Sequence, residues 1–134
     1  MNEQLLSIIE SMSKQELYNE VYLDHLTKLF NRKAFDVDNK PFYAIVDLDS
    51  LKFVNDTLGH RYGDGQLCVL AAGLTEAFGE ASVYRLSGDE FAVKGHDKAA
   101  LANGLAKLAM RLPCFSYGIG DSLELADAQL NTNK

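Results

Sequence analysis

The chain has 134 residues, of which 47% are hydrophobic and 24% are charged, and its formal net charge at pH 7 is −6. This length and composition predict one globular domain with enough apolar residues for a core. The negative charge disfavours a nucleic-acid backbone or an anionic membrane as partner, but it does not disfavour a small nucleotide bridged by a cation.

Three further features indicate the cellular setting. Cys68 and Cys114 both lie among apolar residues and are expected to be reduced core thiols. The N-terminus lacks the basic start of a signal peptide, and no apolar run approaches membrane-spanning length. We therefore expect a cytoplasmic protein that binds neither nucleic acid nor membrane.

Residues 1–23 are expected to form an N-terminal helical segment that precedes the domain at residues 24–134. Apolar residues recur at helical spacing from Leu5 to Met12, and Ser13–Glu16 has the form of a capping box that starts a second helix. Ordinary packing and dimerisation both remain open as roles, although the segment is short for a heptad repeat.

The segment 42–49 is apolar almost throughout and predicts a central strand buried on both faces. A helix capped by Thr27 is expected before it, over residues 27–35. Asp49 at the end of the strand is expected to cap the next helix. Asp47 lies inside the apolar run, where an unpaired carboxylate is costly, so a metal ion is a natural partner for it.

The remaining pattern alternates helices and strands. It predicts helices at 50–58, 65–78 (ended by Gly79), 97–110 and 123–130, a turn at 59–64, and strands at 82–86, 91–94 and 114–120. This order predicts an α/β (α+β) fold with a mixed central sheet surrounded by helices.

The turn between the strands at 82–86 and 91–94 carries two adjacent carboxylates, Asp89 and Glu90, and Gly88 is expected to give it a permissive backbone. A solvated acidic turn is one interpretation. A site for a hard cation is the other, because Mg²⁺ prefers carboxylate oxygens. The strand that ends at Asp47 is expected to lie beside this turn.

Four segments in order resemble the motifs of the diguanylate cyclase, or GGDEF, domain. Residues 24–32 resemble D-x-L-T-G-L-x-N-R, with Lys28 for the glycine, and 47–64 resemble D-I-D-x-F-K-x-x-N-D-x-x-G-H-x-x-G-D. Residues 85–91 resemble the naming motif, with Ser87 for its first glycine. Residues 115–120 and Ala126–Asp127 resemble S-x-G-I-A and the closing A-D-x-A-L-Y-x-A-K.

The resemblance implies a palm-like nucleotide-cyclase fold and a reaction in which two GTP molecules condense to cyclic di-GMP with loss of two pyrophosphates. It implies a homodimer, because each protomer supplies half of the site. It also implies Mg²⁺, with Mn²⁺ as the alternative, and it implies residue roles. The metal ligands would be Asp47, the Leu48 carbonyl, Asp89 and Glu90, and Glu90 or Asp89 would be the general base. Asn55 and Asp64 would bind guanine, and the phosphates would be bound by Ser50, Leu51, Lys52 and Lys134. His60 would also bind substrate, with packing of the turn as its alternative role.

The chain also departs from the family pattern. It is shorter than usual between Phe91 and Ser116, Asn131 replaces a tyrosine, and a further phosphate-contacting G-R pair has no counterpart. At residues 78–81 it lacks both the arginine and the aspartate of the R-x-x-D product site. A degenerate domain that binds GTP without turnover is therefore the first alternative, and a cyclase that makes other cyclic nucleotides is the second.

Overall fold

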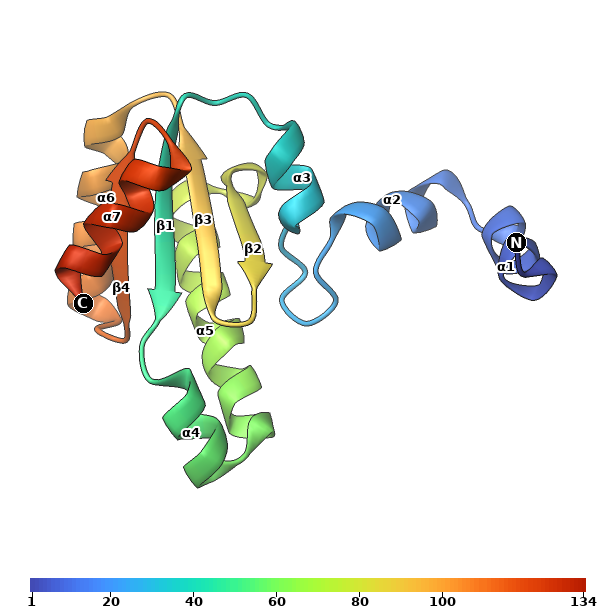
Figure 1. The fold of residues 1–134 in the computed structure, drawn as a ribbon, viewed down its shortest axis with the longest axis horizontal. Coiled ribbons are helices and arrows are strands. Elements are labelled where there is room, and N and C mark those ends of the chain that lie inside the picture. Colours follow the sequence, from blue (N-terminus) through green and yellow to red (C-terminus); the bar gives the residue numbers. More distant parts are fainter.

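The computed structural model describes all of residues 1–134 (Figure 1). Its elements are α1 (Glu3–Ser11), α2 (Lys14–Tyr22), α3 (Arg32–Val37), β1 (Phe42–Leu48), α4 (Leu51–Leu58), α5 (His60–Phe78), a 3₁₀ turn (Glu80–Ser82), β2 (Val83–Ser87), β3 (Glu90–Gly95), α6 (Lys98–Arg111), β4 (Phe115–Gly120) and α7 (Leu123–Asn133). None of the helices is both long and apolar enough to cross a bilayer.

The four strands form one sheet in the order β2-β3-β1-β4, and this confirms the expected α/β class with a central sheet. Every neighbouring pair is antiparallel, so the mixed strand directions expected from the sequence are corrected. After the crossover through α4 and α5, β2 runs in the same direction as β1. However, β3 lies between β1 and β2 and runs opposite to both, so no two neighbouring strands of the sheet are parallel.

Side chains alternate across β1 and feed a separate core on each face of the sheet. Ala44 and Val46 pack with α5 and α6, whereas Ile45 packs on the opposite face with Phe35 of α3 and with α7. All three β1 residues are at most 1% exposed, so the central strand is buried on both faces as predicted. Asp47 therefore directly follows a part of β1 that is buried on both faces.

The last helix lies unusually close to the edge strand β4. A Cβ atom on Gly118 would come within 2.2 Å of the backbone oxygen of Ala126, and a Cβ on Gly120 would come within 2.8 Å of its nitrogen. Glycine at these positions lets α7 rest directly on the strand. The end of α7 is thereby brought to the same end of the sheet as the end of β1 (Figure 1).

The first two helices form an arm beside the domain (Figure 1). Neither α1 nor α2 contains a buried residue. The predicted capping box is confirmed: the Ser13 side chain accepts from the Glu16 backbone, and the Glu16 side chain accepts from the Ser13 backbone.

Two predicted helix starts are wrong. The helix expected from Thr27 begins at Arg32, because the Asn31 side chain caps it, while Thr27 belongs to a turn. The expected turn at 59–64 is the first part of α5, which begins at His60 after a break at Gly59 with φ 92°. Asp49 does not cap α4 either; its carboxylate accepts a hydrogen bond from Ser116 at 2.8 Å.

Lys28, which stands where the motif has glycine, adopts a left-handed backbone with φ 64°. Such a conformation costs an L-residue about 1–2 kcal/mol, and glycine adopts it freely. Because the Lys28 side chain is exposed, Lys28→Gly should raise the free energy of unfolding by about 1 kcal/mol. Urea unfolding of both proteins measures this difference, with Lys28→Ala as the control that should gain nothing; a less stable Lys28→Gly protein would contradict the prediction.

Candidate active site

Two acidic segments meet at the end of the central strand. In the β1–β3 ladder Asp47 pairs with Glu90, and the Leu48 amide donates to the Asp89 carbonyl at 2.9 Å. The expectation that the strand ending near Asp47 lies beside the carboxylate turn is thereby confirmed. The register of the ladder places Asp47 opposite Glu90, and Asp89 lies in the turn directly before β3.

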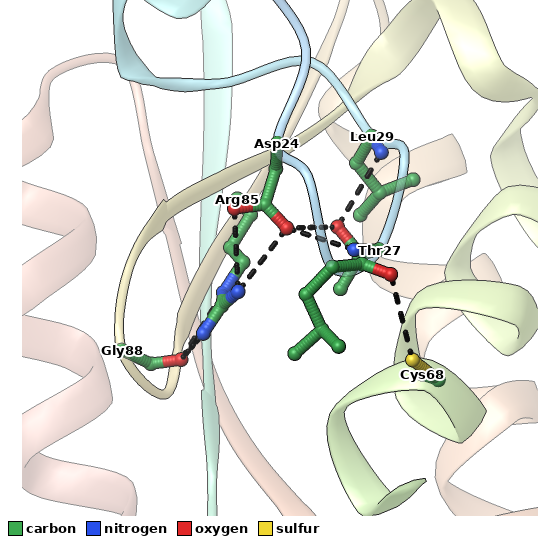
Figure 2. Close-up of polar contacts among 7 residues, drawn as sticks. Asp24, Thr27, Leu29, Cys68, Arg85 and Gly88 are labelled. Carbon is green, nitrogen blue, oxygen red and sulfur yellow. Dashed lines mark hydrogen bonds and ion pairs between the residues drawn. The ribbon is translucent and has the colours of Figure 1, made fainter. Parts of the chain in front are cut away.

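Arg85 binds the backbone of the turn that carries the adjacent carboxylates, at Gly88 (Figure 2). Its guanidinium donates to the Gly88 carbonyl at 2.7 and 3.2 Å and to the Asp24 carboxylate at 3.1 and 3.2 Å. Burial alone would raise the pKa of Asp24, but hydrogen bonds from Thr27 and Arg85 outweigh it and hold the pKa below its ordinary value. The first motif segment thus anchors the turn of the third.

The turn that carries Asp89 contains no left-handed residue, so its backbone does not require glycine. Neither Ser87 nor Gly88 has a positive φ, so the permissive role expected of Gly88 is not seen and Ser87 fits without strain. A Cβ atom on Gly88 would meet nothing within 4 Å. The open space beside the Asp89–Glu90 pair is therefore accessible to a ligand.

The carboxylates at this site carry excess negative charge. Burial, and next the charge of Asp47, raise the pKa of Asp89. Burial, and next the charges of Asp127 and Asp47, raise the pKa of Glu90. Asp127 on α7 was not among the residues expected here, although its place in the closing motif was the available signal.

Asp47 is the residue whose environment best fits a cation. Its Oδ1 atom is buried with no hydrogen-bond partner, and its Oδ2 atom pairs with the ammonium of Lys134. A buried carboxylate oxygen without a partner is costly, so its surroundings fit a hard metal ion. No three His, Cys, Asp or Glu side chains are grouped closely enough to hold a metal ion by themselves.

An open cavity of about 510 Å³ lies over this end of the sheet. It is lined by five of the predicted site residues and by two residues, Asp49 and Ser116, for which no site role was predicted. Its lining is Asp47, Leu48, Asp49, Ser50, Asp89, Ser116 and Lys134. Among the predicted residues, Leu51, Lys52, Asn55, His60, Asp64 and Glu90 are not part of this lining. The Asp49–Ser116 hydrogen bond joins β1 to β4 and was not anticipated.

The predicted guanine-binding residues lie on the α4–α5 hairpin, which projects beyond the sheet (Figure 1). The Asn55 side chain of α4 faces α5, where a Cβ on Gly63 would lie 1.8 Å from Asn55 Oδ1. This oxygen is buried and unpaired. Asp64 follows Gly63 and is exposed, and His60 is exposed as well, so the alternative that His60 packs a turn is wrong.

Cys114 lies beside the acidic end of the sheet, where its carbonyl accepts a hydrogen bond from the Asp49 amide at 2.8 Å. Both cysteines are free, as expected. Cys68, however, is exposed on α5 rather than buried in the core, and its thiol donates to the Leu26 carbonyl at 3.8 Å (Figure 2).

Together, the strands and helices form an α/β domain in which an antiparallel four-stranded sheet carries facing carboxylates at one end. Residues 21–111 match the family model described as diguanylate cyclase, GGDEF domain, and the chain belongs to this family.

Sequence relatives include the probable diguanylate cyclase DgcI of Escherichia coli K12, which is 40% identical over 58% of this chain and 19% of its own length. The cyclic di-GMP phosphodiesterase PdeB of Shewanella oneidensis is 31% identical over 69% of this chain and 12% of its own. The chain therefore spans less than a fifth of either relative.

Solved structures share the fold. The coiled coil and GGDEF domain of DgcB from Caulobacter crescentus, in complex with c-di-GMP, aligns with a TM-score of 0.79 at 22% identity over 97% of this chain and 86% of that one. The FimX GGDEF domain of Pseudomonas aeruginosa aligns with a TM-score of 0.74 at 20% identity over 84% and 93% of the two chains.

Proposed function

We propose that this chain is a diguanylate cyclase domain that condenses two GTP molecules into cyclic di-GMP with release of two pyrophosphates. The observation that carries the proposal is the buried, unpaired oxygen of Asp47 facing the Asp89–Glu90 turn in a chain of the GGDEF family. The family membership makes synthesis of this dinucleotide the expected chemistry, and the charge at the site suits a cation-bridged triphosphate.

In this proposal Asp47, Asp89, Glu90 and the Leu48 carbonyl hold Mg²⁺ or Mn²⁺. The bound metal would lower the pKa of the 3′-hydroxyl nucleophile and neutralise charge on the α-phosphate and its leaving group. Glu90 or Asp89 would accept the proton of that hydroxyl. Two phosphodiester bonds form, and each releases one pyrophosphate.

The remaining predicted residues would bind the nucleotide. Asn55 and Asp64 on the α4–α5 hairpin would read guanine, with His60 nearby at the start of α5. The amides of Ser50 and Leu51, with Lys52, would contact phosphates at the start of α4. Because each protomer supplies one GTP half-site, we propose a homodimer, and we place it in the cytoplasm, where GTP is available.

The second candidate is a degenerate domain that binds GTP as a regulatory module. Two observations favour it: Lys134 already pairs with Asp47, and no three-ligand group is preformed. A relative named as a phosphodiesterase is also among the proteins that contain a similar domain.

Product analysis separates the two candidates. The protein, verified as a dimer in solution, is incubated with GTP and Mg²⁺ or Mn²⁺, and the products are identified by mass. The cyclase predicts cyclic di-GMP and pyrophosphate in a ratio of one to two. GTP binding without any product would support the regulatory module instead.

Feedback inhibition through the R-x-x-D product site is not expected. The corresponding residues 78–81 supply neither an arginine nor an aspartate, so a bound product would lose its guanidinium and carboxylate partners there. Initial rates at increasing cyclic di-GMP should show only competition with GTP. A non-competitive pattern, or product bound beside residues 78–81 in a crystal, would contradict this prediction.

A further inference from the structure

Lys134 supplies the one positive charge that touches the carboxylate site directly. Its ammonium pairs with Oδ2 of Asp47, a residue 87 positions away in the sequence. The Asp47 side chain is 13% exposed, whereas that of Lys134 is 46% exposed. The contact therefore joins a fixed carboxylate to a cation that faces solvent.

The helix that leads to Lys134 rests on the sheet, and the Lys134 side chain reaches from its end to Asp47. Gly118 and Gly120 let α7 rest on β4, and the Asn133 side chain donates to the Tyr117 carbonyl at 2.9 Å. Lys134 follows directly, and its flexible four-carbon side chain is long enough to point to Asp47 or to solvent.

The surroundings of the ammonium are strongly acidic. The hydrogen bond to Asp47 raises the pKa of Lys134, as do the charges of Asp47, Asp89 and Asp49. Neither Asp89 nor Asp49 forms an ion pair, and both line the same cavity as Lys134. An ammonium and a divalent cation would therefore compete for the same oxygens.

We infer that Lys134 is a tethered counter-ion, which occupies the cation position at Asp47 in the metal-free protein and must leave Asp47 when a divalent cation binds. This inference rests on the proposed function, because it takes Asp47 as a metal ligand. The ion pair stabilises the metal-free fold, and it weakens the binding of metal in the absence of nucleotide.

The test is a titration of the nucleotide-free protein with Mn²⁺, with free Mn²⁺ followed by electron paramagnetic resonance. Lys134→Met should bind Mn²⁺ about fivefold more tightly than wild type, which is the scale of a partly exposed ion pair. The difference should shrink at high ionic strength. Lys134→Arg keeps the cation and should bind Mn²⁺ as weakly as wild type, and Lys107→Met, an exposed lysine of α6 without an ion pair, should be unchanged.

Thermal unfolding gives a second readout that needs no metal. Without metal, Lys134→Met should unfold about 3 °C below wild type, and saturating Mn²⁺ should remove the difference. If Lys134→Met binds Mn²⁺ no more tightly than wild type, the inference is wrong while the metal site stands. If neither protein binds Mn²⁺, the metal site of the proposed function fails and the competition fails with it.

Discussion

Gly63→Ala should weaken GTP binding by about a hundredfold. The new Cβ would lie 1.8 Å from Oδ1 and 2.9 Å from Cγ of Asn55, which is closer than any real contact. Either Asn55 leaves its position or α4 and α5 move apart, and both changes displace a predicted guanine-binding group. A buried polar group left without its hydrogen-bond partner costs about 1–3 kcal/mol, which at the upper end is about a hundredfold in affinity.

Gly65→Ala is the matched control in the same helix. A Cβ at this position would meet nothing within 4 Å, so GTP affinity should not change. The free energy of unfolding should rise by about 0.5–1 kcal/mol, because alanine is favoured over glycine inside a helix. This variant separates the contact with Asn55 from the general effect of adding a methyl group to α5.

Calorimetric titration with GTP and ATP measures both parts of the assignment. Wild type should prefer GTP, because the Asp64 carboxylate accepts the two donors of the guanine edge, and adenine does not present them in that pattern. Gly63→Ala should lose much of this preference. Unchanged GTP affinity in a folded Gly63→Ala protein would remove Asn55 from the site, and equal binding of GTP and ATP by wild type would contradict the guanine assignment.

Glu90→Gln should lower the rate of cyclic di-GMP formation by about 10²–10⁴-fold. The substitution keeps the shape of the side chain and removes the charge that would hold a cation or accept the nucleophile's proton. Both roles act mainly in the transition state, so GTP affinity should change much less than the rate. Single-turnover rates and GTP titrations of both proteins test this, and an unchanged rate would remove Glu90 from the chemistry.

The same substitution should stabilise the metal-free protein at neutral pH. Burial and the charges of Asp127, Asp47 and Asp89 raise the pKa of Glu90 above its ordinary value of 4.5. The folded state therefore binds a proton more tightly than the unfolded state, and wild type loses stability as the pH rises from 4.5 through the folded pKa. Glu90→Gln lacks this loss, so its advantage should be present at pH 7 and vanish below pH 4.5.

A purely structural turn predicts the opposite for stability, because Glu90 would then need a cationic partner such as Arg85. In the structure the Arg85 guanidinium is engaged by Asp24 and the Gly88 carbonyl instead. Thermal midpoints of wild type and Glu90→Gln across pH 4–8 distinguish the two accounts. A lower midpoint for Glu90→Gln at pH 7 would show that Glu90 stabilises the fold.

The strands could be predicted from the sequence because they are local and strongly apolar, and the capping box at Ser13 because its partners are three residues apart. The start of α3 could not be predicted as easily. Thr27 and Asn31 are both good caps, and the choice depends on Asp24, whose carboxylate binds Thr27 and the distant Arg85. Tertiary contacts thus decided between two equivalent local signals.

The candidate site also has a part that local sequence predicts and a part that depends on tertiary contacts. Asp47, Asp89 and Glu90 could be predicted because the motifs place them at a strand end and in a hairpin turn, whereas Asp127 reaches Glu90 only through the packing of α7. The pairing of Lys134 with Asp47 and the contact between Gly63 and Asn55 depend on helix packing, and nothing in the local sequence indicates either contact. The first part of α5 could not be predicted, because glycines at 59, 63 and 65 are typical of a turn, although only Gly59 has a positive φ.

The most direct test of the central claim is a crystal structure with a non-hydrolysable GTP analogue and Mg²⁺. We expect guanine at Asn55 and Asp64, phosphates at the start of α4, and the metal on Asp47 with Asp89 or Glu90. We also expect the Lys134 ammonium to have left Asp47. An analogue bound away from the α4–α5 hairpin, or a triphosphate bound while Asp47 keeps Lys134 and no metal, would contradict this claim.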